Sequence, residues 1–151
     1  MGNSVTDSHD LGTLAGQVML TVQNEHFDRL HRAGYPDVGP RHGAVLAHLT
    51  PQGVRATELS RKCGQLKQVV GHIVDDLEHL GYVTREPDPE DRRAKLVVPT
   101  ARGRRLLRAS EAIQSDIAGR HAALLGASEY TRFLDNLRAV VEHQLKITGG
   151  Q

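Results

Sequence analysis

Polar side chains suited to contacting duplex DNA gather at two places in the middle of this 151-residue chain. The first group surrounds the start of a helical segment and comprises Gln65, Lys67, Gln68, Gly71 and His72. The second group lies in a short polar loop and comprises Asp91, Arg92, Arg93 and Lys95. Glutamine pairs bidentately with adenine, lysine addresses guanine or phosphate, and arginine fits a narrow minor groove. These residue types favour DNA recognition.

Each group also has a purely structural interpretation. Gly71 costs about 1 kcal/mol relative to alanine inside a helix, so we expect a reason for it. That reason is either a close approach of the backbone to DNA or close packing against a neighbouring helix. The charges of the loop are equally compatible with a solvated, salt-bridged surface, which is what most charged runs are.

The distribution of charge supports the DNA interpretation modestly. The net charge is only +1. Residues 55–108 hold twelve Lys and Arg against eight Asp and Glu, a net +4, whereas residues 1–54 and 109–151 carry −2 and −1. The positive charge therefore lies where phosphates would be contacted.

The spacing of apolar residues predicts the elements that position these groups. A long helix is expected over about residues 10–33, capped by Ser8 or Asp10, and a second helix begins near Pro40. A short third helix covers residues 57–63 and ends at Gly64. The fourth helix covers residues 66–80 and ends at Gly81. It carries one buried stripe formed by Leu66, Val70, Ile73, Leu77 and Leu80.

Two strands, residues 82–85 and 95–98, follow the fourth helix and are joined by a loop with two prolines. A fifth helix capped by Thr100 and a sixth capped by Ser128 complete the chain, with Gly126 between them. The predicted fold is mainly α with a small β-hairpin wing, a winged helix-turn-helix. We expect one domain over residues 1–151, with a DNA-binding lobe at 40–100 and dimerisation helices at 10–34 and 101–148.

Three stretches of the chain resemble the MarR family of transcriptional regulators. Residues 88–100 are similar to that family's wing, residues 73–83 to the end of its recognition helix and first wing strand, and residues 56–60 to its preceding helix. The resemblance implies a dimer held by the first, fifth and sixth helices, and commonly a repressor released by a small ligand. It also implies that Arg93 is the wing arginine and Asp91 its partner.

One position departs from the family pattern. The family usually has Ser or Thr where Leu66 begins the recognition helix, and losing that cap costs roughly 1 kcal/mol. Either Gln65 supplies the cap, or the helix start is weaker and DNA affinity is lower.

The remaining polar residues suggest little further chemistry. The nine histidines follow no metal-binding pattern, so we expect scattered surface histidines, no metal, no cofactor and no enzymatic activity. The single cysteine, Cys63, is expected to be a buried inert thiol. A ligand pocket is expected where the first, second and fifth helices meet, lined by His26, Arg29 and His42.

The sequence therefore predicts a cytoplasmic, homodimeric regulator that binds a pseudo-palindromic double-stranded DNA operator, with a small-molecule effector and no membrane span. Two alternatives remain. One is a winged-helix module for protein interaction, favoured only by the missing cap at Leu66. The other is a small-molecule-binding module with weak DNA affinity.

Overall fold

The computed structural model describes residues 10–149, so Ser8 and the rest of the N-terminal segment 1–9 lie outside the described residues. The chain divides into two compact units, one ending at Ile113 and one beginning at Gln114. No helix within residues 10–149 is both long and apolar enough to cross a membrane.

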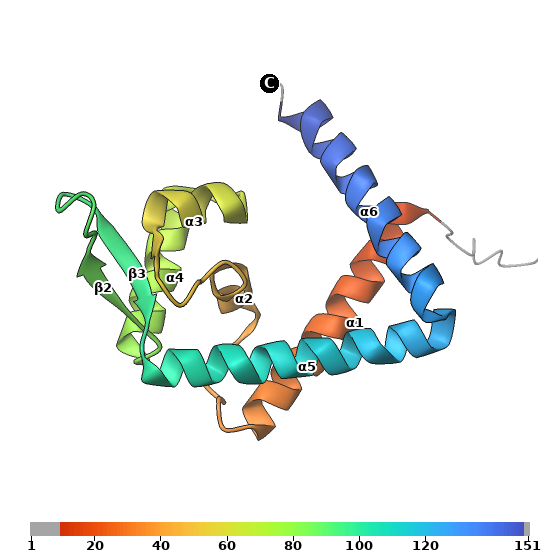
Figure 1. Cartoon of the computed structure of the whole chain (residues 1–151), viewed down its shortest axis with the longest axis horizontal. Coiled ribbons are helices and arrows are strands. Elements are labelled where there is room, and N and C mark those ends of the chain that lie inside the picture. The colour runs from red at the N-terminus through yellow and green to blue at the C-terminus, as the bar shows by residue number, and fades with distance from the viewer. Residues whose placement is uncertain (1–9, 150–151) are drawn as a thin grey trace, which may run out of the picture. The chain divides into compact units, whose positions relative to one another are not determined.

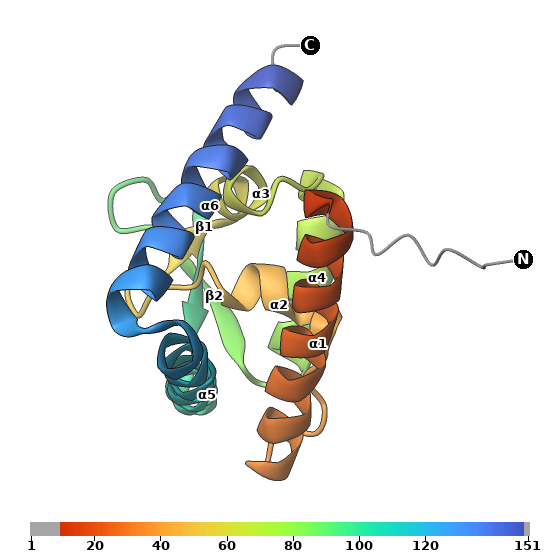
Figure 2. The ribbon, with the colours of Figure 1, turned by 90° about the vertical axis from the view of Figure 1, so that its right-hand side faces the viewer.

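The first unit contains the predicted lobe, and its elements lie close to their predicted bounds (Figure 1). Its helices and strands are, in chain order, α1 (Leu11–Arg32), α2 (Pro40–Leu46), β1 (Val54–Arg55), α3 (Ala56–Cys63), α4 (Lys67–His79), β2 (Val83–Pro87), β3 (Lys95–Pro99) and the first half of α5 (Ala101–Leu125). The helix α2 contacts α1, α3 and α4, and both views show it at the centre of this unit (Figures 1 and 2).

The helix ends follow local rules of capping. Asp10 caps α1 by accepting a hydrogen bond from the backbone N–H of Thr13 at 2.9 Å. Thr100 accepts from the N–H of Gly103 at 3.0 Å, which confirms it as the cap of α5. The cap expected from Ser128 is wrong, because α6 (Ala127–Thr148) begins directly after Gly126 and makes no side-chain capping bond.

The wing is a sheet of three strands rather than a simple hairpin. The order is β1-β3-β2, with both pairs antiparallel. Val54 of β1 pairs with Val97 of β3, and Val83 of β2 pairs with Pro99. The sequence did not predict β1, because a strand of two residues is too short to show an alternation of apolar and polar residues. The strand fixes one edge of the hairpin to the start of α3.

The core of this unit is aliphatic and centres on α4. Val70, Val74 and Leu77 are fully buried, as are Leu59 of α3 and Val45 of α2. The stripe predicted for α4 is wrong at its first member. Leu66 precedes the helix in an extended conformation and is 75% exposed, and Val74 belongs to the buried face instead.

A close contact joins α5 to the base of the wing. A Cβ added to Gly103 would lie 1.9 Å from the carbonyl oxygen of Tyr82, so only glycine allows this approach. The buried Tyr82 hydroxyl donates to Asp37 at 2.5 Å and accepts from Arg102 at 2.9 Å. Burial and Asp37 raise the pKa of Tyr82 to about 12, while Arg102 opposes the shift. The start of α5 is thereby tied to β2 and to the loop after α1.

The second unit contains the end of α5 and all of α6, and its apolar side chains are largely uncovered. None of the described residues of α6 is buried. The exposed apolar side chains of α6 are Phe133, Leu134, Val140, Val141, Leu145 and Ile147. The N-terminal half of α1, in the first unit, exposes Leu11, Leu14, Val18, Met19 and Leu20 in the same way.

Candidate nucleic-acid interface

The start of α4 presents polar side chains and uncapped backbone amides to solvent. Gln65, Lys67, Gln68 and His72 are exposed. No side chain caps the helix, and its first turn contains no acidic residue. The first amides of a helix carry partial positive charge and lack partners within the helix, so this end of α4 attracts anions.

Of the two alternatives for the start of this helix, the one in which Gln65 supplies the cap is wrong. The backbone of Gln65 is instead held by Ser60, whose hydroxyl donates to the Gln65 carbonyl at 2.7 Å. The Gln65 N–H donates in turn to the Ser60 carbonyl at 3.3 Å. These bonds fix the turn between α3 and α4 and leave the Gln65 side chain exposed.

The structure separates the two explanations for Gly71. A Cβ added at this position would meet no atom within 4 Å, so no neighbouring helix of the chain requires glycine there. Gly71 lies one turn after Lys67 in α4 and is half-buried. The explanation by packing within the chain is therefore wrong, and a close approach from outside the chain remains.

The tip of the wing carries the second basic group. Arg92 and Arg93 are exposed in the loop between β2 and β3, and Lys95 is exposed at the first position of β3. Asp91 accepts a hydrogen bond from the backbone N–H of Arg93 at 3.1 Å, rather than holding its guanidinium as the sequence suggested. Asp91 thus shapes the loop, and within residues 10–149 no recorded ion pair involves the Arg93 guanidinium.

A different carboxylate anchors this loop. Asp88, 7% exposed, pairs with Arg55 of β1 at 2.5 Å and accepts from the backbone N–H of Glu90 at 2.8 Å. These partners, the Glu90 amide first and then Arg55, hold the pKa of Asp88 below its ordinary value despite the opposing effect of burial. Sequence analysis missed this pair because Arg55 lies 33 residues earlier on an unrecognised strand.

A second set of ion pairs joins the wing to α4. Arg85 of β2 contacts Asp75 at 2.5 Å and Glu78 at 2.8 Å, both on α4. Together with the Arg55–Asp88 pair, it fixes the wing relative to the helix whose N-terminus is exposed. Arg55 and Arg85 are thus occupied within the chain, whereas Arg92 and Arg93 remain exposed.

Of the three residues expected to line a ligand pocket, Arg29 alone lines the hollow between α1 and α5 described below. His42 is 1% exposed and bonds to Asp76 of α4 at 2.7 Å and to the Gly39 N–H at 3.0 Å. His26 is buried and lies 3.1 Å from the Ser110 hydroxyl. Burial, followed by the charge of Arg29, lowers the pKa of His26. The expectation of surface histidines is wrong for His26 and His42.

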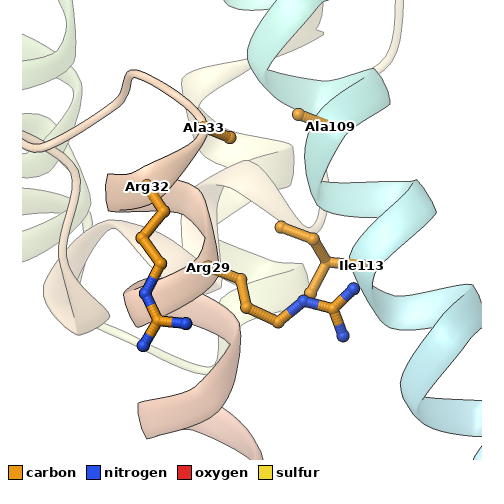
Figure 3. A pocket seen from close by; sticks show the side chains of 5 residues that line it. All are labelled: Arg29, Arg32, Ala33, Ala109 and Ile113. Atoms are coloured by element: carbon orange, nitrogen blue, oxygen red, sulfur yellow. The ribbon is translucent and has the colours of Figure 1, made fainter.

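Arg29 does line an open hollow between α1 and the first half of α5. The hollow has a volume of about 420 Å³ and is lined by Arg29, Arg32, Ala33, Ala109 and Ile113. Figure 3 shows the Arg29 side chain reaching across toward Ile113 of α5. Two guanidinium groups over an apolar floor suit an anionic ligand with an apolar part.

No metal-binding cluster is found among residues 10–149.

The Cys63 thiol donates to the Ala44 carbonyl at 3.4 Å, and burial raises the pKa of this thiol. Cys63 is half-buried, rather than fully buried as the sequence had suggested. Its raised pKa lowers the thiolate fraction, which favours an inert thiol.

Comparison with known proteins identifies the lobe. The profile of the MarR family matches residues 37–94, from the loop before α2 to the wing tip. Residues 37–94 are thus similar to the MarR family, and the match includes the helix-turn-helix α3–α4 and the strand β2 of the wing. An uncharacterized HTH-type transcriptional regulator of Bacillus subtilis (strain 168), YcgE, is 50% identical over 44 residues, a match that spans 29% of each chain.

MarR-type structures match beyond the lobe. The structure of CouR from Rhodococcus jostii RHA1 bound to p-coumaroyl-CoA is 27% identical and covers 92% of this chain and 95% of its own, with a TM-score of 0.73. The repressor CouR bound to a 23-mer DNA duplex is 25% identical and covers 89% of this chain and 94% of its own, with a TM-score of 0.72. The MarR-type fold thus extends over the flanking helices as well.

Proposed function

We propose that this protein is a transcriptional regulator that binds double-stranded DNA in a sequence-specific manner. The observation that carries the proposal is the exposure of two basic groups, at the start of α4 and at the wing tip, on a winged helix-turn-helix. The N-terminal end of α4 enters the major groove, which alone is wide enough for a helix. Arg93 and its neighbours at the wing tip reach the adjacent minor groove.

A homodimer completes this DNA-binding unit. Apolar side chains are exposed on α6 and, separately, on the N-terminal half of α1, and exposed apolar surface of this kind marks protein–protein interfaces. Pairing of these faces about a two-fold axis covers them and presents two copies of α4 to a pseudo-palindromic operator. A duplex partner also implies a cytoplasmic location.

The hollow between α1 and α5 is the proposed effector site. Arg29 and Arg32 supply charge for an anionic group, and Ile113 supplies apolar contact. The complex of CouR with p-coumaroyl-CoA, an anionic thioester, supports a ligand of this chemical class. Because α5 leads directly from the wing to this hollow, occupancy of the hollow can alter the spacing of the two recognition helices and release the repressor from DNA.

The deciding experiment is a titration of the full chain against randomised duplex pools at several salt concentrations. We expect binding whose logarithm falls linearly with the logarithm of salt, followed by enrichment of a two-fold symmetric site. Gln68→Ala should relax the preference at one position per half-site by roughly 1–3 kcal/mol of discrimination. Duplex binding that is absent at low salt would favour the protein-interaction alternative.

A further inference from the structure

Two apolar side chains at the start of α4 are left exposed by the described part of the chain. Leu66 is 75% exposed and Val69 is 43% exposed. Leu66 is the N-cap residue of α4 and Val69 lies in its first turn, three residues later. Val70, on the same turn, is fully buried, so the exposure of its neighbours does not reflect loose packing of the helix. The proposed DNA-reading end of α4 therefore carries an apolar pair among its polar groups.

We propose that Leu66 and Val69 recognise thymine by contacting its C5-methyl group in the major groove. That methyl group is the apolar feature that base pairs present there, and apolar side chains read it. The inference rests on the proposed function and adds to it a specificity determinant: adjacent thymines at the position of each half-site that faces the first turn of α4. Gln68 lies between the two residues in sequence and reads a neighbouring base edge.

The charges around the pair favour DNA over a protein partner. Lys67 lies between Leu66 and Val69, and the first turn contains no acidic residue. Its uncapped amides add partial positive charge, and the exposed Arg92, Arg93 and Lys95 follow on the wing. A polyanion that also offers apolar methyl groups satisfies both parts of this surface. Leucine in place of a capping residue at position 66 then exchanges a local hydrogen bond for a base contact.

Replacing thymine by deoxyuridine tests the contact directly, because the exchange removes only the methyl group. A duplex selected by the wild-type protein is resynthesised with deoxyuridine at one thymine at a time. We expect wild-type affinity to fall about fourfold at one or two positions per half-site, the value of one buried methyl group. Leu66→Ala or Val69→Ala should bind the thymine duplex more weakly and lose the sensitivity to deoxyuridine at that position.

Two further variants keep the test decisive. Lys67→Ala, on the same exposed turn, should weaken binding to thymine and deoxyuridine duplexes alike and retain the fourfold difference. Leu66→Ser supplies a helix cap, so it should raise the melting temperature while abolishing the difference at the contacted thymine. Folding and base recognition then change in opposite directions, which separates this proposal from a structural role of Leu66.

The outcomes distinguish the inference from the function on which it rests. Selective duplex binding with no deoxyuridine effect, or an effect that persists in both Leu66→Ala and Val69→Ala, overturns the thymine contact and leaves the DNA-binding function intact. Absence of duplex binding overturns both. Reduced self-association of Leu66→Ala in light scattering, with unchanged thymine sensitivity, identifies the pair as a contact between protein chains and also overturns the inference.

Discussion

The two ends of the wing use similar residues in opposite ways. At its base, Tyr82, Asp37 and Arg102 bond to one another, and Arg102 stacks 4.5 Å from the Tyr82 ring centre. At its tip, Arg92 and Arg93 are exposed, and the carboxylate beside them bonds to backbone. An arginine occupied by a carboxylate and an aromatic ring holds elements together, whereas an exposed one is available to a partner.

The comparison predicts that substitutions at the base act on folding and that substitutions at the tip act on DNA binding. The start of α4 resembles the tip, because its polar side chains are exposed and its amides are uncapped. Folding stability tests the first half of this comparison and DNA affinity tests the second.

Gly103→Ala should have the largest effect. The added Cβ would lie 1.9 Å from the Tyr82 carbonyl oxygen, so α5 must shift away from the wing. We expect a loss of roughly 3 kcal/mol in the free energy of unfolding, measured by denaturant titration. Gly119→Ala in the same helix is the matched control. Its Cβ meets nothing within 4 Å, so it should stabilise the protein by up to about 1 kcal/mol. Equal effects at the two glycines would contradict the close contact at the base.

Arg93→Ala should weaken binding to specific and non-specific duplex alike, on the order of tenfold. The slope of log affinity against log salt should fall by about one, because one phosphate-region contact is lost. The melting temperature should stay unchanged, since the side chain is exposed. Arg55→Ala is the contrasting variant and should lower the melting temperature by removing the partner of Asp88.

Asp91→Ala should act in the same direction as Arg93→Ala but less strongly, because it shapes only the backbone of the loop. Unchanged DNA affinity together with a lowered melting temperature in Arg93→Ala would show that the tip is structural, like the base.

Asp88→Asn should make stability less dependent on pH in acid. The Glu90 amide and Arg55 hold the folded-state pKa of Asp88 below its ordinary value of 3.8. The carboxylate therefore stabilises the fold above that value, and this contribution is lost as the pH falls through the folded-state pKa. The melting temperature of Asp88→Asn should lie below that of the wild type at pH 7, and the difference should narrow as the pH falls below 3.8. A difference in melting temperature that stays constant across this range would show that ionisation of Asp88 does not stabilise the fold.

Gly71→Ala should have a small effect on folding, opposite in sign to that of Gly103→Ala. Nothing in the chain opposes a Cβ there, so helix propensity should raise stability by up to about 1 kcal/mol. If the backbone approaches DNA at this point, affinity should fall at the same time, as measured by titration against the selected duplex. A more stable variant with wild-type affinity would show that DNA does not approach the backbone closely at Gly71.

The elements of the lobe could be predicted from sequence because their determinants are local. Helical spacing of apolar residues, Gly64 and Gly81 after α3 and α4, and Thr100 at the start of α5 all act within a few residues. The exposed residues of the site were also correctly placed, since Lys67, Gln68, Arg92 and Arg93 lie outside the core. Their roles in DNA binding stay predictions.

The tertiary structure alone decided which residues pair and which remain exposed. The Arg55–Asp88 and His42–Asp76 contacts join positions 33 and 34 residues apart, and no local pattern encodes such distances. Leu66 was assigned to the core by its spacing, yet it precedes the helix with an extended backbone and points away from the buried face. Periodicity fixes a face only for residues inside the helix, because outside it the backbone no longer turns 100° per residue.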